Sequence, residues 1–300
     1  MLSSFVKALP QLLIIIALSF CGPALAEREL ASQPETREIH RLLNTNQARA
    51  ALEKAKSYAK ANDASAEAHY WLGAVSGNLA SSASIFSAPS LARQAKTAFE
   101  RAAALDAKHI EARVALVQFH LQAPGIVGGD DELIPGLIAQ ITAINPGAGL
   151  RAQALVKMTA EDFAGAQPLY LQALALDASD ADAISGVVAV AAKTKQYQVA
   201  DVALKKALAQ APESAKLRYQ AGKLAALSGS ELAPALAHLD ALLAQKPAPA
   251  GVSVAGLHFR RGQILAHLGR KPEAISALER ALQIGPSKEI TAELARLRKG

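Results

Sequence analysis

Apolar positions recur at helical spacing along most of the chain, in paired segments separated by short turns. The clearest pair lies in residues 257–286. Side chains spaced three or four residues apart predict a first helix that ends at Gly269, because glycine adopts the left-handed conformation that follows many helix C-termini. Pro272 starts a second apolar stripe, where its missing N–H costs nothing, and Gly285 and Pro286 end it. The segment therefore predicts a helical hairpin.

Small residues occupy regular positions in this hairpin. Gly262, Ala274, Ala281 and Pro286 fall at positions 8, 20, 27 and 32 of a 34-residue period. Small side chains let two helix backbones approach closely, and proline breaks the chain before the next unit. The pattern resembles the tetratricopeptide repeat, which implies an all-α fold of stacked hairpins.

The period recurs through the chain, because Pro146, Pro212 and Pro286 are each separated by close to two repeats. The resemblance implies a right-handed superhelical α-solenoid of about seven hairpins, closed by a capping helix over residues 287–300. The expected units are residues 35–62, 66–107, 109–146, 148–178, 181–212, 215–247 and 254–286.

The first 26 residues differ from the rest. Lys7 precedes an apolar run over residues 12–20, and Ala24-Leu25-Ala26 is a small-x-small cleavage motif. We interpret residues 1–26 as a secretory signal peptide, followed by a polar linker over residues 27–34, and expect an exported, periplasmic protein. An uncleaved anchor is disfavoured because the apolar run is short for a membrane span.

Composition narrows the function. Hydrophobic residues make up 51% of the chain and aromatic residues 4%, which favours close-packed Ala/Leu helices over a sheet. Cys21 is the single cysteine and lies in the signal, where the preceding Phe20 disfavours lipidation, so the mature chain has no disulfide or thiol chemistry. A net charge of +6, reduced by one when Lys7 is removed, is no nucleic-acid signature. With no second apolar run of membrane-spanning length, we expect no stable membrane insertion after cleavage.

Two connections look enlarged, at residues 80–90 and 123–131. Each would join the two helices of adjacent hairpins, so both would emerge at the same edge. Together with the neighbouring helices they also resemble uncharacterised exported bacterial tetratricopeptide proteins. One alternative function is therefore a small-ligand receptor or enzyme with a pocket formed by Phe86, Pro89, Ile126 and Val127. We instead expect these loops to pack on each other, through Ile85, Phe86, Ile126 and Val127.

Signals for catalysis are weak. The histidines lack the i,i+4 spacing of a helical metal site, and the GIVGGD segment matches neither a dinucleotide nor a P-loop motif. His120 lies near Asp130 and Asp131 in sequence, but a helix-end histidine with two capping acids explains them more simply. The sequence predicts a non-enzyme with no catalytic residues, no cofactor and no metal.

The resemblance implies that the first helices line a concave groove that binds a protein or an extended peptide. Residues 193–223 carry seven Lys or Arg against two acids, which suits carboxylates on such a ligand. The asparagines of the two-carboxylate clamp are missing, so that partner class is not transferred. A third alternative is a structural subunit of an envelope assembly. The expected groove residues are Tyr70, Asn78, Gln118, Arg151, Lys193, Lys216, Tyr219, Lys223, Phe259, Gln263 and His267.

Overall fold

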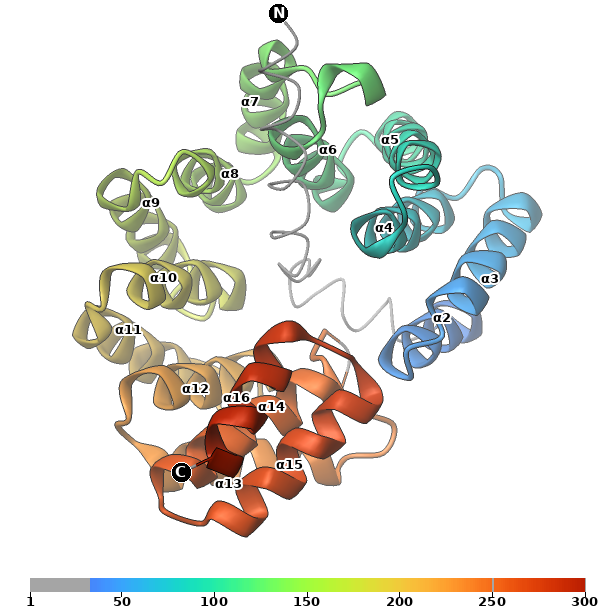
Figure 1. The fold of residues 1–300 in the computed structure, drawn as a ribbon. Helices are drawn as coiled ribbons and strands as arrows, with labels where there is room; N and C mark the ends of the chain where they lie inside the picture. The colour runs from blue at the N-terminus through green and yellow to red at the C-terminus, as the bar shows by residue number, and fades with distance from the viewer. Residues whose placement is uncertain (1–32, 250, 300) are drawn as a thin grey trace, which may run out of the picture. The chain divides into compact units, whose positions relative to one another are not determined.

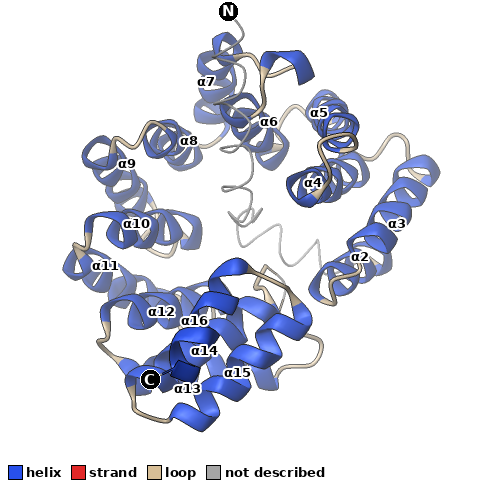
Figure 2. Ribbon diagram, in the orientation of Figure 1, coloured by secondary structure: helices blue, strands red, loops and turns tan. Residues whose placement is uncertain are grey.

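The computed structural model describes residues 33–249 and 251–299, and across them the regular secondary structure is helical with no strand (Figure 2). The predicted fold class, an all-α array of helical hairpins, is confirmed. Within residues 48–159, and separately within residues 163–299, consecutive helices run side by side (Figure 1). The predicted signal peptide and nearly all of the predicted linker lie outside the described residues.

The chain divides into two compact units. Of the described residues, unit 1 comprises 33–43 and 47–159, and unit 2 comprises 44–46, 160–249 and 251–299. The boundary falls inside the expected fourth hairpin. Unit 1 contains α2 (Pro34–Asn44), α3 (Ala48–Ala61), α4 (Ala66–Ser82), α5 (Ala88–Leu105), α6 (Ile110–Gln122), the 3-10 turns η2 (Gly125–Val127) and η3 (Asp131–Leu133), α7 (Ile134–Ile144) and α8 (Pro146–Thr159).

Unit 2 has the same alternation of first and second helices. Its first helices α10, α12 and α14 contact one another in series. Its helices are α9 (Phe163–Leu176), α10 (Ala181–Thr194), α11 (Tyr197–Gln210), α12 (Ala215–Ser228), α13 (Leu232–Ala244), α14 (Val254–His267), α15 (Lys271–Ile284) and α16 (Lys288–Lys299).

Hydrogen bonds from backbone N–H groups to capping side chains fix where several first helices begin. Ser65, Ser214 and Ser253 precede α4, α12 and α14, and each hydroxyl accepts from the backbone N–H three residues later. Asp180 caps α10 in the same way. These contacts satisfy donors that have no partner inside the helix.

In three hairpins, a glycine of the first helix faces a large apolar side chain of the second helix where the two helices meet; we call this contact the seam. A Cβ at Gly262 would lie 2.8 Å from the Leu278 side chain, which is closer than packed atoms approach. Ala274 and Ala281 are fully buried on the same helix pair. A Cβ at Gly73 would likewise lie 2.6 Å from the Phe99 ring, and one at Gly222 would collide with the Leu239 side chain.

The turns within the unit 2 hairpins each contain a residue in the left-handed backbone conformation. Lys195, Gly229 and Gly269 follow α10, α12 and α14 with φ of 64°, 74° and 74°. In the turn after α12, Glu231 takes a second left-handed conformation at φ 53°. The left-handed residue reverses the chain so that the second helix can pack back on the first.

Buried polar groups tie the hairpins of unit 1 together. The Arg113 guanidinium is buried and donates to the carbonyl oxygens of Ala103, Asp106 and His109. It therefore satisfies acceptors at the C-terminal end of α5. His109 caps α6, because its Nδ1 accepts from the Ala112 N–H at 3.2 Å.

The connection expected over residues 80–90 is much shorter than predicted. α4 continues to Ser82 and α5 begins at Ala88, so the extra residues mainly lengthen two helices. The connection after α6 is irregular, with two 3-10 turns. Serine, proline and alanine in residues 80–90 suggested that the helix is interrupted there. Alanine and serine can also continue a helix when it packs on its neighbour.

The last helix packs on the final hairpin. Ile290 and Leu294 of α16 join Phe259, Leu278 and Ala281 in one apolar cluster. Its remaining surface is charged and includes an ion pair between Arg298 and Glu279 at 2.5 Å. The helix thus covers apolar area of the last hairpin with a polar outer face.

Candidate functional site

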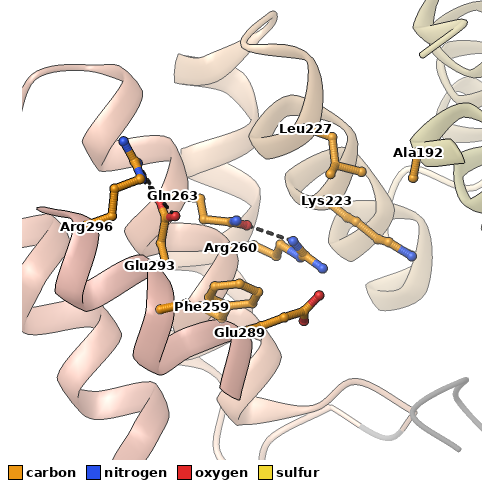
Figure 3. A pocket seen from close by; sticks show the side chains of 10 residues that line it. Ala192, Lys223, Leu227, Phe259, Arg260, Gln263, Glu289, Glu293 and Arg296 are labelled. Carbon is orange, nitrogen blue, oxygen red and sulfur yellow. Dashed lines mark hydrogen bonds and ion pairs between the residues drawn. The ribbon is translucent and has the colours of Figure 1, made fainter. Parts of the chain in front are cut away.

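An open pocket in unit 2 collects three of the predicted groove residues. It has a volume of about 450 Å³ and lies between α12, α14 and α16, with Ala192 of α10 at its edge (Figure 3). Lys223, Phe259 and Gln263 line it. First helices of successive hairpins are neighbours here, so side chains from two repeats and from the capping helix converge on one space.

Lys223 enters the pocket from α12 as a partly buried ammonium. Burial and, to a smaller extent, the nearby positive charge of Arg260 together lower the pKa of Lys223 from its ordinary value to about 8, and Glu289 acts in the opposite sense. Within the described residues no hydrogen bond or ion pair joins its Nζ to another side chain. A desolvated amine without a counterion is costly to keep charged.

Arg260 is the second cation in the pocket and comes from α14. Its Nη1 donates to Gln263 Oε1 at 2.7 Å, and its Cζ lies 4.7 Å from the centroid of the Phe259 ring. Its Nε is buried with no hydrogen-bond partner. Figure 3 shows the Arg260 guanidinium next to Gln263 and Phe259, on the side of the pocket that faces Lys223.

The acids of α16 complete the lining. Glu293 is paired with Arg296, with 2.6 Å between Oε1 and Nη2. Glu289 is exposed and makes no ion pair within the described residues, although Figure 3 shows it on the Arg260 side of the pocket. With three cations and two carboxylates the lining carries a small positive excess.

Other predicted groove residues of unit 2 have structural contacts. Lys216 is buried and its Nζ lies 3.5 Å from Asp182 Oδ1 of α10, so it presents little surface to a ligand, and its role in the groove stays a prediction. Its long aliphatic stem is covered by the neighbouring first helix. His267 donates from Nε2 to the Ala226 carbonyl oxygen at 3.1 Å. Lys193 is exposed on α10.

Tyr219 lies at the contact between α12 and α14. A side chain at Gly256 would lie 2.7 Å from the Tyr219 hydroxyl, so the close approach of the two helices depends on this glycine. Tyr219 is partly buried and packs against the core of unit 2. It borders a first-helix surface but is not part of the pocket lining.

The predicted groove residues of unit 1 do not gather in the same way. Tyr70 is 6% exposed and its ring lies 5.9 Å from Phe99 and 5.2 Å from His109, centroid to centroid. The ring fills the core between α4, α5 and α6 and presents little surface to a ligand, so its role as a groove contact stays a prediction. Asn78 is exposed, and Gln118 and Arg151 are partly exposed.

His120 contacts the Asp130 segment through the backbone. Its Nδ1 accepts from the Asp130 N–H at 3.0 Å, while the Asp130 carboxylate accepts from the Glu132 N–H. Burial lowers the pKa of His120, and Lys96 lowers it further against the opposing effect of nearby acids. The ring holds a loop in place, and no acid–base pair forms between these side chains.

The two predicted loops do not pack on each other through their apolar tips. Ile85, Phe86 and Ile126 are 69%, 88% and 76% exposed, whereas Val127 is buried. The expectation of mutual packing is therefore wrong for three of the four residues. These side chains form apolar tips on unit 1 instead of a closed wall.

Metal-binding clusters and membrane-spanning helices are both absent from the described part of the chain. Residues 33–249 and 251–299 contain no cluster of three or more His, Cys, Asp or Glu able to hold a metal ion. Over the same ranges, none of the helices combines the length and the apolar content needed to cross a bilayer.

Arg260 and the acids of α16 were missed by the sequence reasoning. Arg260 does not occupy one of the groove positions expected from the repeat pattern, and α16 was expected only as a cap. The adjacent Phe259 was predicted. An arginine next to an aromatic residue on a first helix is the sequence signal from which Arg260 could have been found.

Comparisons with known proteins agree with the hairpin architecture. The tetratricopeptide repeat family model matches residues 255–288, the register expected from Gly262, Ala274 and Ala281. No curated protein matches the chain significantly by sequence.

Solved structures show the fold at low identity. Yeast Tom70 has a TM-score of 0.50 at 12% identity, over 89% of this chain and 57% of that chain. Cut9 of the APC/C Cut9–Hcn1 hetero-tetramer has a TM-score of 0.50 at 14% identity, over 89% of this chain and 49% of that chain. A tetratricopeptide repeat protein from Parabacteroides merdae has a TM-score of 0.48 at 15% identity, over 92% and 100% of the two chains. This chain thus spans about half the length of the first two proteins.

Proposed function

Because the chain is a tetratricopeptide repeat protein, we propose that it is a non-catalytic scaffold that binds a protein or extended peptide along its first helices. Tetratricopeptide arrays commonly bind proteins or peptides. The observation that carries the proposal is the open pocket of unit 2, where charged, polar and aromatic side chains from α12, α14 and α16 converge. A rigid helical surface with such side chains suits an extended ligand.

The proposal includes a location. The signal-like features of residues 1–26 support export to the periplasm of a bacterial envelope. Fractionation of cells expressing the tagged full chain, with N-terminal sequencing of the product, tests it. We expect a periplasmic product that begins at Glu27, and a cytoplasmic product that begins at Met1 would contradict the location.

Site-specific photocrosslinking in whole cells tests partner binding. A photoreactive amino acid at Gln263 lies in the pocket, and one at Val202, which is 60% exposed on the second helix α11, is the matched control. We expect a discrete crosslinked protein or peptide from position 263 and none from position 202. Crosslinks that are equal at both positions, or absent at 263, would argue against binding at the first helices.

Exposed apolar side chains favour a second candidate, a structural role in an envelope assembly. Ile85, Phe86 and Ile126 lie on the connections of unit 1 and are among its most exposed large apolar residues. The variant Phe86→Ser with Ile126→Ser should leave crosslinking at 263 unchanged. If it also leaves the apparent size of the native assembly unchanged, this second candidate is wrong.

A further inference from the structure

We propose that Lys223 and Arg260 form a binding site for one carboxylate group of an acidic peptide. The inference depends on the proposed peptide-binding function and names the chemistry that this surface recognises. The two cations belong to successive first helices, α12 and α14, and line the same open pocket of about 450 Å³ (Figure 3). A ligand that lies along the first helices would therefore meet both.

The cations of the pocket differ from other cations of unit 2. Arg261 is paired with Asp240 at 2.6 Å and Arg270 with Glu273 at 2.6 Å, so each already has a carboxylate. Within the described residues, Lys223 has no such partner, and Arg260 Nε is buried with no acceptor. Two like charges kept close, with neither one in an ion pair within the described chain and only the exposed Glu289 carboxylate nearby, favour the binding of an external anion.

The arginine is held in position for this role. Gln263 Oε1 accepts from Arg260 Nη1 at 2.7 Å, and the Phe259 ring lies against the guanidinium. Less side-chain entropy is lost on binding when the donor is already ordered. Ala192, Leu227 and Phe259 add apolar wall for the aliphatic part of a peptide residue.

The charge of the lining favours a single carboxylate over a dianion. Glu293 is neutralised by Arg296, and Glu289 faces the two cations from α16. One negative charge balances the excess of the pocket, whereas a phosphate dianion would meet the unpaired Glu289 carboxylate at close range.

Binding should be coupled to protonation of Lys223, whose pKa is lowered to about 8 by burial and by Arg260. A bound carboxylate favours the charged amine and raises this pKa. The charged groups that face Lys223 are Arg260 on α14, and Glu289 with the Glu293–Arg296 pair on α16, while α10 presents Ala192. Affinity should thus fall as the pH rises through about 8, and the variant Lys223→Arg should lose this dependence.

The test is a nuclear magnetic resonance titration of the mature chain with ¹³C-labelled lysine. Three probes distinguish the carboxylate sources: acetyl-Ala-Leu-Ala with a free C-terminus, acetyl-Ala-Glu-Ala-amide, and neutral acetyl-Ala-Leu-Ala-amide. We expect at least one acidic probe to raise the pKa of Lys223, and the neutral probe to leave it unchanged. Equal effects of all three probes, or none from either acid, would overturn the proposal.

Variants test the two cations. Lys223→Met and Arg260→Gln should each weaken binding of the acidic probe by about tenfold or more, the loss expected for one charge-assisted hydrogen bond. Lys206→Met removes an exposed lysine of the second helix α11, outside the pocket, and should bind as the wild type does. Melting curves confirm that each variant is folded, and Arg260→Lys, which keeps the charge, should bind more tightly than Arg260→Gln. Wild-type affinity in both folded loss-of-charge variants would overturn the inference.

Failure of the inference and of the proposed function are distinguishable. If position 263 still crosslinks a partner while the acidic probes do not bind, the carboxylate site is wrong and the scaffold proposal stands. If the acidic probes bind through Lys223 but position 263 crosslinks nothing in cells, the site is supported and the proposed macromolecular partner is wrong.

Discussion

Lys216 and Lys223 lie on the same face-forming helix, α12, and have opposite environments. Lys216 Nζ is 3.5 Å from the Asp182 carboxylate, whereas Lys223 faces Arg260 and has a pKa lowered to about 8. A paired buried charge is costly to break, and an unpaired one is costly to keep. Neutral substitutions at these two positions should therefore change stability in opposite directions.

We predict that Lys223→Met stabilises the fold at pH 7. The folded pKa lies below the unfolded one, so the charged lysine destabilises the fold at all pH values below about 8. That penalty disappears as the pH rises from about 8 to the unfolded pKa near 10.5. After allowance for partial exposure, we expect a gain of about 1–2 kcal/mol at pH 7 that shrinks towards pH 10.5.

Urea unfolding at pH 7 and at pH 10 measures this gain. The matched control is Lys216→Met, which removes the ammonium that lies 3.5 Å from the Asp182 carboxylate and should lower the free energy of unfolding at pH 7. The account of Lys223 is wrong if its methionine variant is less stable than the wild type at pH 7.

A second residue-scale prediction concerns His120. Burial holds its pKa below the ordinary value, so the unfolded chain binds a proton that the folded chain does not as the pH falls below about 6.5. Stability present above that pH is then lost on acidification, with a slope of up to about 1.4 kcal/mol per pH unit for one proton.

The variant His120→Asn keeps a side-chain acceptor for the Asp130 N–H but does not titrate in this range. We expect a shallower loss of stability between pH 7 and pH 5, measured by urea unfolding. His238 also has a pKa lowered by burial, so His238→Asn is the comparison at a site that holds no loop. Identical slopes for wild type and His120→Asn would show that His120 does not contribute.

At the scale of elements, the hairpin depends on small residues where its two helices meet and on one residue of left-handed conformation in its turn. Gly262 against Leu278 and Gly222 against Leu239 set the helix separation, and Gly269 reverses the chain at φ 74°. The same conformation occurs at Lys195, where φ is 64° and the side chain has a Cβ. A left-handed conformation is strained for most residues other than glycine.

We predict that Lys195→Gly stabilises unit 2 by roughly 0.5–1 kcal/mol, because glycine adopts the left-handed conformation without strain. Gly269→Ala should lower stability by about 1 kcal/mol or more at the equivalent place in the last hairpin. Thermal unfolding of both variants measures the effect. A lower melting temperature for Lys195→Gly would mean that its lysine side chain contributes more than the strain removes.

The same elements show what a sequence can and cannot predict. The seam and the turns follow from residue type, because only small residues fit the close approach and glycine favours the reversed turn, so Gly262, Ala281 and Gly269 were predictable. The residues that line the groove were harder to predict from the sequence. A repeat position says which way a side chain points, but Tyr70 and Lys216 are buried by neighbouring helices that the pattern does not place. Arg260 acquires its role from Lys223, which lies on the preceding first helix.

At the scale of the whole molecule, stability is distributed among neighbouring helices. Each unit has its own buried clusters, and those of unit 2 run from α12 to α16. In repeat arrays stability is roughly a sum of terms for each repeat and for contacts with its neighbours. A fragment that begins at the boundary between the two units, after residue 159, should therefore keep most of its own contacts.

We predict that a fragment of residues 160–300 folds. It retains α9 to α16, including Tyr170 packed on Gly186. Circular dichroism should show helix and a cooperative thermal transition. A fragment of residues 232–300 lacks α12 and exposes Leu239 of α13, so it should have less helix per residue and a lower melting temperature. An unfolded longer fragment would contradict the independence of this unit.

The fully buried alanines of the second helices have a consequence for how this chain tolerates sequence drift. Ala102, Ala207 and Ala281 have no exposed surface and sit where helices nearly touch. Losing one methyl there costs about 1 kcal/mol, while adding carbon atoms forces helices apart and costs roughly 1–3 kcal/mol. A leucine-rich core shows the reverse asymmetry, since truncation is its costly change. In a saturation library, these positions should accept glycine or serine and reject every bulky residue, however hydrophobic.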